Sequence, residues 1–260
     1  MGKASGTQAL RLSRMQELVA ERGPLQIAEA ARLLQVTPMT IRRDLSAPGA
    51  SLKALGGYVL ATTLPAAGRY SLDEAVDQHA ANKRLACRRA ARNVKAHDSL
   101  FIDCGDTMAH FAEELPPDIP LSVVCYSMNI ASILSRRPRT QLMLLGGLYH
   151  ASSATFSSDE GLQFLDRLGL NKAFISAGGL HPERGASCSN FHEVPVKQMA
   201  IRRASESVVV VDESKLGAMR PAFFGPLDTV DRIVVGGMPA PTVRKLFKAF
   251  PMEYVDAAAE

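Results

Sequence analysis

The spacing of apolar residues changes along the chain and predicts two kinds of structure. In the first 60 residues the spacing is helical. Residues 8–22 and 27–34 each place apolar side chains on one face of a predicted helix, the second at i, i+3, i+4 and i+7. A third helix is predicted over 37–45, because Thr37 is a good N-cap and Pro38 fits the first helical position. Two short helices with a tight turn between them form a helix-turn-helix.

The two faces of the third helix have different predicted roles. At 100° per residue, Pro38, Ile41 and Leu45 share one side and are expected to face the core. The opposite side would enter the DNA major groove, where Arg reads guanine and the methyl groups of Thr and Met contact thymine. The candidate DNA-contacting residues are Thr37, Met39, Thr40, Arg42, Arg43 and, on the hairpin that follows, Lys53.

A β-hairpin is predicted behind this helix, since apolar segments flank the glycine pair at 56–57. With the helices it would form a winged helix-turn-helix over residues 1–62. The net charge of +4 lies here, because residues 1–60 hold eight Lys or Arg against four Asp or Glu and the rest is balanced. A basic small domain on a neutral larger one indicates a unit that binds a polyanion, and the helix-turn-helix pattern makes double-stranded DNA the expected partner. The alternative is a plain three-helix cap with two surface arginines.

Residues 63–95 are predicted to connect two domains. Small residues over 62–70 indicate a boundary, and an S-x-x-E capping box at 71–74 predicts a helix that reaches about Val94. A row of cations on this helix suits either a second DNA or phosphate patch or a solvated face, and we favour the solvated face. These cations are Lys83, Arg84, Arg88, Arg89 and Arg92.

Residues 96–260 have the pattern of an α/β domain. Short β-branched runs alternate with helix-like segments, which predicts a mainly parallel sheet. The tail after residue 251 indicates only an edge strand and a frayed end. Ligands bind beyond the carboxyl ends of parallel strands, so the residues that follow each run should build the site. The predicted strands lie at 99–103, 121–125, 141–145, 172–177, 207–212 and 232–235.

The residues at these strand ends suit a phosphorylated sugar. Gly105 and Thr107 belong to a turn that begins a helix, and the N–H groups of such a turn bind anions. Lysines suit a phosphate, whereas carboxylates and amides suit sugar hydroxyls. The sequence has no nucleotide-binding glycine motif and no metal-ligand spacing, so we expect no cofactor and no metal. The candidate effector-binding residues are Asp103, Gly105, Asp106, Thr107, Ser127, Asn129, Gly146, Gly147, Gly178, Glu193, Lys197 and Lys215.

Both parts of the chain resemble the DeoR family of bacterial repressors. The string LQIAEAARLLQVTPMTIRRDL and the wing LGGYVL resemble its helix-turn-helix, whose DNA-reading helix matches 37–45. The turn at 103–107, the glycine pair at 146–147, E-x-x-x-K at 193–197 and D-x-S-K at 212–215 resemble its sensor domain. The resemblance implies a fold like that of ribose-5-phosphate isomerase and CoA transferases, with a phosphorylated sugar as effector.

Longer strings make the resemblance more specific. CYSMN, GGLYHASSATF and GASCSNFHEVPVK are similar to the branch of the family that is controlled by deoxyribose 5-phosphate. Two positions depart from the family pattern: Asp106 stands where Thr is usual, and Asn171 where Asp is common. A carboxylate at position 106 would repel a phosphate unless it points away or binds a sugar hydroxyl.

The sequence therefore predicts a transcriptional repressor, not an enzyme, that binds operator DNA under control of a sugar phosphate. We expect a homo-oligomer, because one short recognition helix reads too few base pairs. The lack of an apolar run of ~18 residues, of a secretory signal and of paired cysteines predicts a cytoplasmic protein without a membrane segment. The alternative is a sugar-phosphate isomerase or deaminase with a fused regulatory head, in which Asp103, Asp106 or Glu193 would be the catalytic base.

Overall fold

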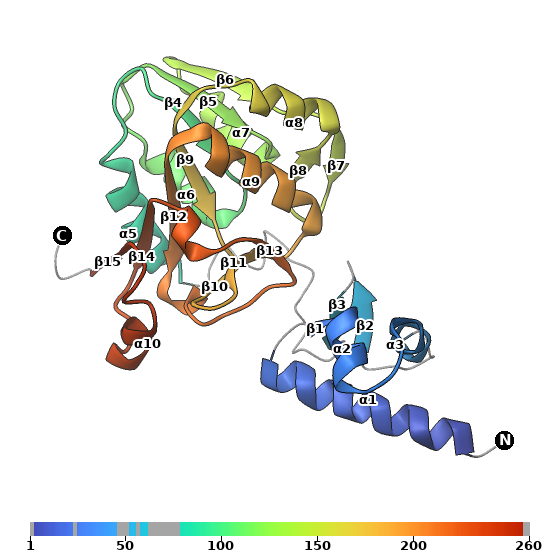
Figure 1. The fold of residues 1–260 in the computed structure, drawn as a ribbon. Coiled ribbons are helices and arrows are strands. Elements are labelled where there is room, and N and C mark those ends of the chain that lie inside the picture. Colours follow the sequence, from blue (N-terminus) through green and yellow to red (C-terminus); the bar gives the residue numbers. More distant parts are fainter. Residues whose placement is uncertain (1–2, 23–24, 46–51, 56–57, 62–78, 257–260) are drawn as a thin grey trace. The chain divides into compact units, whose positions relative to one another are not determined.

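The computed structural model describes residues 3–22, 25–45, 52–55, 58–61 and 79–256. The chain divides into two compact units, Met1–Arg69 and Tyr70–Glu260, and each is described by itself (Figure 1). No helix within these residue ranges is long and apolar enough to cross a membrane.

The first unit is a winged helix-turn-helix, as the sequence predicts. Strands β1, β3 and β2 form an antiparallel sheet in that order, and β2 and β3 are the predicted hairpin. Its core contains Met15, Ile27, Ile41, Leu52 and Val59, all of them buried. The elements are α1 (Lys3–Arg22), β1 (Leu25–Gln26), α2 (Ile27–Leu33), α3 (Pro38–Leu45), β2 (Leu52–Leu55) and β3 (Tyr58–Ala61).

Helix α3 begins as predicted but packs differently at its first residue. The amide of Thr40 donates to Thr37 Oγ1 at 3.2 Å, so Thr37 is the N-cap. Ile41 is buried as predicted, whereas Pro38 is exposed, so its assignment to the core side was wrong. Pro38 opens the helix and lies beyond the reach of the core. Asp44 is buried instead.

An ion pair fixes the orientation of α3 against α1. Arg11 donates from Nε to Asp44 Oδ2 at 2.8 Å and from Nη2 to Oδ1 at 3.2 Å. The hydrogen bond to Asp44 is the main cause that raises the pKa of the Arg11 guanidinium. The acid of the I-R-R-D string is thus used inside the unit, which leaves Arg42 and Arg43 exposed on the outer side of the helix.

The second unit is built on a seven-stranded sheet in the order β15-β14-β12-β9-β4-β5-β6, with every neighbouring pair parallel. All six predicted strands are confirmed, and the predicted edge strand in the tail is β15. The strands are β4 (Ser99–Ile102), β5 (Leu121–Cys125), β6 (Thr140–Leu144), β9 (Leu170–Ser176), β12 (Ala204–Asp212), β14 (Arg232–Gly236) and β15 (Met252–Val255).

Helices cover both faces of this sheet (Figure 1). Phe111 of α6 packs on Phe174 of β9 with ring centroids 4.1 Å apart on one face, and Leu165 and Ala200 belong to the core of the other. The predicted capping box at 71–74 lies outside the described residues. The covering helices are α5 (Ala80–Ala91), α6 (Asp106–Glu114) and α7 (Met128–Leu134) on one face, and α8 (Asp159–Asp166), α9 (Val194–Arg203) and α10 (Pro241–Leu246) on the other.

Two small sheets extend from the carboxyl ends of the strands and were not predicted. Their strands have three or four residues, several of them Gly or Ser, so no periodic pattern shows in the sequence. They are β7 (Leu148–His150) with β8 (Thr155–Ser157), and β10 (Gly179–His181), β11 (Gly185–Cys188) and β13 (Ala222–Gly225). Three 3₁₀ turns accompany them: η1 (Phe191–Glu193), η2 (Glu213–Lys215) and η3 (Leu227–Thr229).

The first turn of α5 rests on the end of β14 at a glycine. A Cβ at Gly236 would overlap the backbone carbonyl of Asn82, whereas a Cβ at the exposed Gly169 would meet nothing within 4 Å. We expect Gly236→Ala to lower the free energy of unfolding by about 2 kcal/mol or more, because overpacking must displace backbone. Gly169→Ala, the matched control, should stay within about 0.5 kcal/mol. Urea denaturation measures both, and equal midpoints would contradict the close approach.

Candidate functional site

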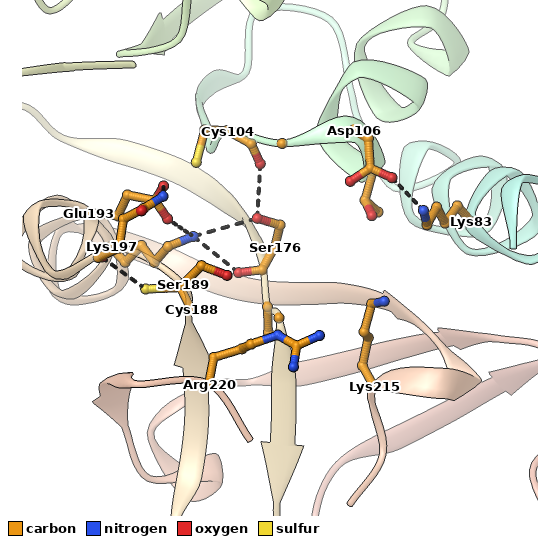
Figure 2. Close-up of a pocket in the computed structure, with 15 residues that line it drawn as sticks. Lys83, Cys104, Asp106, Ser176, Cys188, Ser189, Glu193, Lys197, Lys215 and Arg220 are labelled. Carbon is orange, nitrogen blue, oxygen red and sulfur yellow. Dashed lines mark hydrogen bonds and ion pairs between the residues drawn. The ribbon is translucent and has the colours of Figure 1, made fainter. Parts of the chain in front are cut away.

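A polar cavity opens at the carboxyl ends of β4, β9 and β12 (Figure 2). The sequence predicts the site at these carboxyl ends. Its volume of about 160 Å³ is below the ~300–1,000 Å³ of pockets for drug-sized ligands, so it suits a small ligand. The lining residues are Lys83, Cys104, Gly105, Asp106, Thr107, Ser176, Ala177, Gly178, Cys188, Ser189, Asn190, Glu193, Lys197, Lys215 and Arg220.

Buried Lys197 forms one end of the cavity. Its amine donates to Asp103, which directly follows β4, and to the carbonyl of Ser176 at 3.1 Å. Asp103 also accepts from the backbone N and the hydroxyl of Ser176, both at 2.8 Å, and from Tyr126 at 2.8 Å. Burial lowers the pKa of Lys197, but the neighbouring charges, Asp103 first, outweigh burial and raise it overall. Lys197 is therefore a fixed cation.

Glu193 lies next to this lysine, one helical turn away. Its carboxylate is 3.9 Å from Lys197 Nζ and accepts a hydrogen bond of 2.8 Å from the side-chain amide of Asn190. Burial raises the pKa of Glu193, and Lys197 and Asn190 only partly oppose this. The carboxylate of η1, the amide of its N-cap residue Asn190 and the hydroxyl at the end of β9 thus meet at one end of the cavity, where they suit the hydroxyls of a sugar.

The start of α6 forms another wall. Gly105 is the N-cap of this helix at φ +95°, a conformation that favours glycine, and Asp106 and Thr107 form its first turn. The carboxylate of Asp106 forms an ion pair with Lys83 of α5, and both side chains are almost fully buried. Lys83 therefore neutralises the carboxylate of Asp106, the residue that stands where Thr is usual in the family. The helix terminus remains able to bind an anion.

Lys215 and Arg220 supply two more cations (Figure 2). Lys215 is 3.6 Å from the carboxylate of Asp212, and Arg220 forms no ion pair within the described part of the chain. The side chain of Arg220 packs against Gly178, where a Cβ would lie only 2.7 Å from Arg220 Cγ. With Lys83 and Lys197 against Asp106 and Glu193, cations outnumber acids in the lining, so the cavity suits an anion.

The two lining thiols have no chemical role that the structure supports. Burial raises the pKa of the Cys188 thiol to about 12 and that of Cys104 well above its ordinary value. A buried thiol that stays protonated is a packing residue, as the sequence indicates. Among the described residues, no group of three or more His, Cys, Asp or Glu is placed to hold a metal ion.

The structure brings together most of the predicted effector residues but not all of them. Asp103 lies behind the cavity wall and contacts Lys197, while four predicted residues lie elsewhere. Ser127 and Asn129 hydrogen-bond to each other after β5, and Gly146 and Gly147 line a shallow groove beside β6. Those that line the cavity are Gly105, Asp106, Thr107, Gly178, Glu193, Lys197 and Lys215.

Sequence reasoning missed several lining residues. Lys83 belongs to the row of cations on α5 that was favoured as a solvated face. Arg84, Arg88 and Arg89 of that row do pair with acids on α6 and β15. Asn190 carried a signal, since it lies within the string GASCSNFHEVPVK. Arg220 carried none, because it lies in a loop with no motif. Asn171, the second residue that departs from the family pattern, accepts a hydrogen bond from the backbone of Ser99. It lies at the amino ends of the strands, away from the cavity.

In the first unit five of the six predicted DNA-contacting residues lie on α3 or directly before it. Met39, Arg42 and Arg43 are exposed on α3, and Thr37 is exposed at its start. Thr40 is half-buried, and Lys53 lies on β2. This helix and the cavity of the second unit define a class of protein, a DNA-binding regulator with a separate ligand-sensing unit.

The comparisons with known proteins identify the family. Residues 11–63 match the DeoR-like helix-turn-helix domain, and residues 78–237 match the DeoR C terminal sensor domain. The chain therefore belongs to the DeoR family, and the predicted class, a DNA-binding transcriptional repressor, is confirmed.

The most similar relatives include two regulators. The chain is 38% identical over 224 residues to the deoxyribose operon repressor of Escherichia coli (strain K12), covering 86% of this chain and 88% of that protein. It is 27% identical over 228 residues to the HTH-type transcriptional regulator IolR of Bacillus subtilis (strain 168), covering 86% and 90%.

Solved structures are more distant. Ribose 5-phosphate isomerase A from Methanocaldococcus jannaschii is 18% identical with a TM-score of 0.41, covering 53% of this chain and 55% of that one. A probable sor operon regulator from Shigella flexneri is 11% identical with a TM-score of 0.44, covering 68% and 91%. Scores of this size say nothing about ligand or activity.

A stacked histidine pair includes His192, which lies between Asn190 and Glu193 in the chain. The rings of His150 and His192 are parallel within 10°, with centroids 3.6 Å apart, and His192 Nε2 is 3.2 Å from Thr155 Oγ1. Burial, and then the charge of His150, lower the pKa of His192 from 6.5 to about 4. The folded protein thus holds His192 neutral at a pH where the unfolded chain takes up a proton.

This shift predicts a pH dependence. Because the unfolded state binds the proton first, the free energy of unfolding should fall as the pH drops from about 6.5 toward 4. His192→Gln removes the titrating group, so the same fall should be smaller in that variant. Urea denaturation at several pH values across this window compares the two proteins. Identical pH slopes would show that His192 titrates alike in the folded and unfolded states.

Proposed function

We propose that this repressor is controlled by a phosphorylated sugar bound in the cavity. The observation that carries the proposal is the division of the cavity into two ends. One end offers the start of a helix with Lys83 and Lys215, and the other offers carboxylate, amide and hydroxyl groups around Lys197 (Figure 2). A ligand with a phosphate at one end and hydroxyls at the other matches this division.

The phosphate would lie at the start of α6, between Lys83, Lys215 and Arg220. Arg220 is the strongest candidate for direct contact, because a guanidinium binds phosphate oxygens in pairs and no carboxylate among the described residues already occupies it. Lys83 is paired with Asp106, so a phosphate would compete with that carboxylate or share the lysine with it. Asp106 then lowers affinity for the phosphate without excluding it.

Deoxyribose 5-phosphate is the effector that we propose. Its support is the 38% identity to a repressor that is named for the deoxyribose operon, together with the strings CYSMN and GASCSNFHEVPVK. The polar end of the cavity is formed by side chains of Ser176, Asn190 and Glu193, which suit the hydroxyls of any pentose phosphate.

We propose that the cavity binds its ligand without converting it. A catalytic base needs free acceptor capacity, but Asp103 already accepts hydrogen bonds from Tyr126, Ser176 and Lys197. Asp106 is occupied by Lys83. Glu193 is the remaining candidate, and turnover of ribose 5-phosphate that Glu193→Gln abolishes would establish the isomerase alternative.

Helix α5 would carry the signal toward the DNA-binding unit. It is the first described element after that unit in chain order, and its first turn touches the site twice. Lys83 pairs with Asp106, and Asn82 donates to Glu213 at 3.2 Å, in the turn that also carries Lys215. A phosphate held between Lys83 and Lys215 would act on both contacts. If the effector lowers operator affinity, it must itself bind the DNA complex more weakly.

A second copy of the chain belongs to this function. A single α3 reads few base pairs, and paired half-sites on DNA mirror the two-fold symmetry of a protein dimer. We therefore propose a homo-oligomer on an operator with two half-sites.

The effector is tested by thermal shift with phosphorylated sugars. Deoxyribose 5-phosphate at ~100 times its Kd should add about 2.7 kcal/mol of stability, and ribose 5-phosphate, glucosamine 6-phosphate and fructose 1-phosphate should add less. Arg220→Gln should weaken binding about tenfold or more, since it removes charge-assisted hydrogen bonds. Arg202→Gln, on the exposed side of α9, is the control. A rise with another sugar would overturn the choice of effector, and no rise with any would overturn sugar-phosphate sensing.

DNA binding is tested with operator duplexes that the protein selects from random sequence. The affinity should fall steeply with salt, at a log–log slope of about −0.9 for each phosphate neutralised. Arg42→Ala and Arg43→Ala should each cost about 1–3 kcal/mol if they contact bases, or reduce the slope by about 1 if they contact phosphates. Arg14→Ala, an exposed arginine on α1 that pairs with Glu17, is the control. A flat salt response would contradict this interface.

A further inference from the structure

An exposed surface beside β6 lacks charge. Residues 140–158 contain no Asp, Glu, Lys or Arg, in a chain in which 22% of residues are charged. The segment is nevertheless on the outside, since Leu148 and Tyr149 on β7 are 68% and 47% exposed. Exposed residues that avoid charge over such a length are typical of the core of a protein interface.

This surface includes a groove. Leu144 of β6, the glycine pair after it and Phe164 of α8 line the groove, and Glu160 is the single charged residue in the lining. Leu144 and Phe164 are themselves exposed. We call Leu144, Leu148, Tyr149 and Phe164 the β6-edge surface. It is separate from the effector cavity, with which it shares no residue.

Strand β6 also has an open edge. It is the last strand of the seven-stranded sheet and pairs with β5 alone among the described strands. Proteins that keep such an edge free of partners place Lys, Pro or a bulge on it. The strand reads TQLML and has none of these residues. Leu142 and Met143 pack against the cores of the unit, whereas Leu144 is exposed. The outer backbone groups of β6 and the side chain of Leu144 are therefore available to the same partner.

We propose that the β6-edge surface joins two copies of this chain about a two-fold axis. In such a contact each surface meets its own copy, so a patch with a single charged residue, Glu160, keeps repulsion between like charges small. A two-fold axis perpendicular to the strands also sets the two β6 strands antiparallel, an orientation in which their backbone groups can pair. The exposed Leu246 of α10 fits this criterion less well, because two cations, Arg244 and Lys245, lie beside it on the same helix, whereas the groove beside β6 has one acid in its lining.

The inference rests on the proposed function, because that function requires a second copy of the chain. The test is sedimentation velocity of the full chain over a range of concentrations. Leu148→Glu and Phe164→Glu should at least halve the mass of the assembly, or raise its Kd at least 100-fold. The matched controls are Leu246→Glu and Met238→Glu, at side chains 63% and 44% exposed against 68% and 44% for the test pair. Both controls should keep the wild-type mass.

Three results would overturn the interface: a wild-type chain that is monomeric throughout, test variants that keep its mass, or controls that dissociate equally. Thermal shift with deoxyribose 5-phosphate is measured on all five proteins. Its retention in Leu148→Glu and Phe164→Glu shows that these variants are folded, so dissociation then supports the interface. If the ligand shifts the melting temperature of none of the five proteins while their masses are as expected, the effector proposal is overturned and the interface is still supported.

Discussion

One buried carboxylate holds the sensor cavity together. Asp103 is fully buried at the end of β4 and would be costly there without compensation. Its oxygens accept from Tyr126 after β5, from Ser176 at the end of β9 and from Lys197 of α9. Three strands and a helix are thus fixed by one side chain, at the edge of the sheet where a ligand can enter. Two of the residues that compensate Asp103, Ser176 and Lys197, also line the cavity.

The second buried cation, Lys83, is also compensated by a nearby carboxylate. Lys83 reaches the cavity from α5 and is compensated by Asp106 at the start of α6, so the departure from the family pattern at position 106 comes with its own counter-ion. Each buried lysine is matched by a nearby aspartate, and Lys215 and Arg220 add positive charge near the surface. The arrangement lets an anion bind without leaving a lone charge in the apolar interior when the ligand departs.

The sequence predicts those parts of the fold that depend on local patterns. The six strand runs, the cap at Thr37 and the glycine turn before α6 are local signals, and all are present. Strand order is not a local signal. Ser127 follows a true strand end, but β5 lies one strand farther from the cavity than β4, and Ser127 there forms a bridge with Thr155 of β8. Arg220 and Lys83 were missed for the same reason, because only tertiary packing decides which of many cations turns inward.

The burial that builds the cavity also limits its chemistry. An amine acts as a nucleophile only when it is deprotonated, yet the charges around Lys197 raise its pKa. Asp103 already accepts hydrogen bonds from Lys197, Ser176 and Tyr126. Cys188 stays protonated because burial raises the pKa of its thiol to about 12. In the proposed function, such groups would recognise a polar ligand by fixed charge and shape, and of the acids considered as a base only Glu193 would remain to react with it. The site thus has the properties that a sensor requires, since a repressor that consumed its effector would erase its own signal.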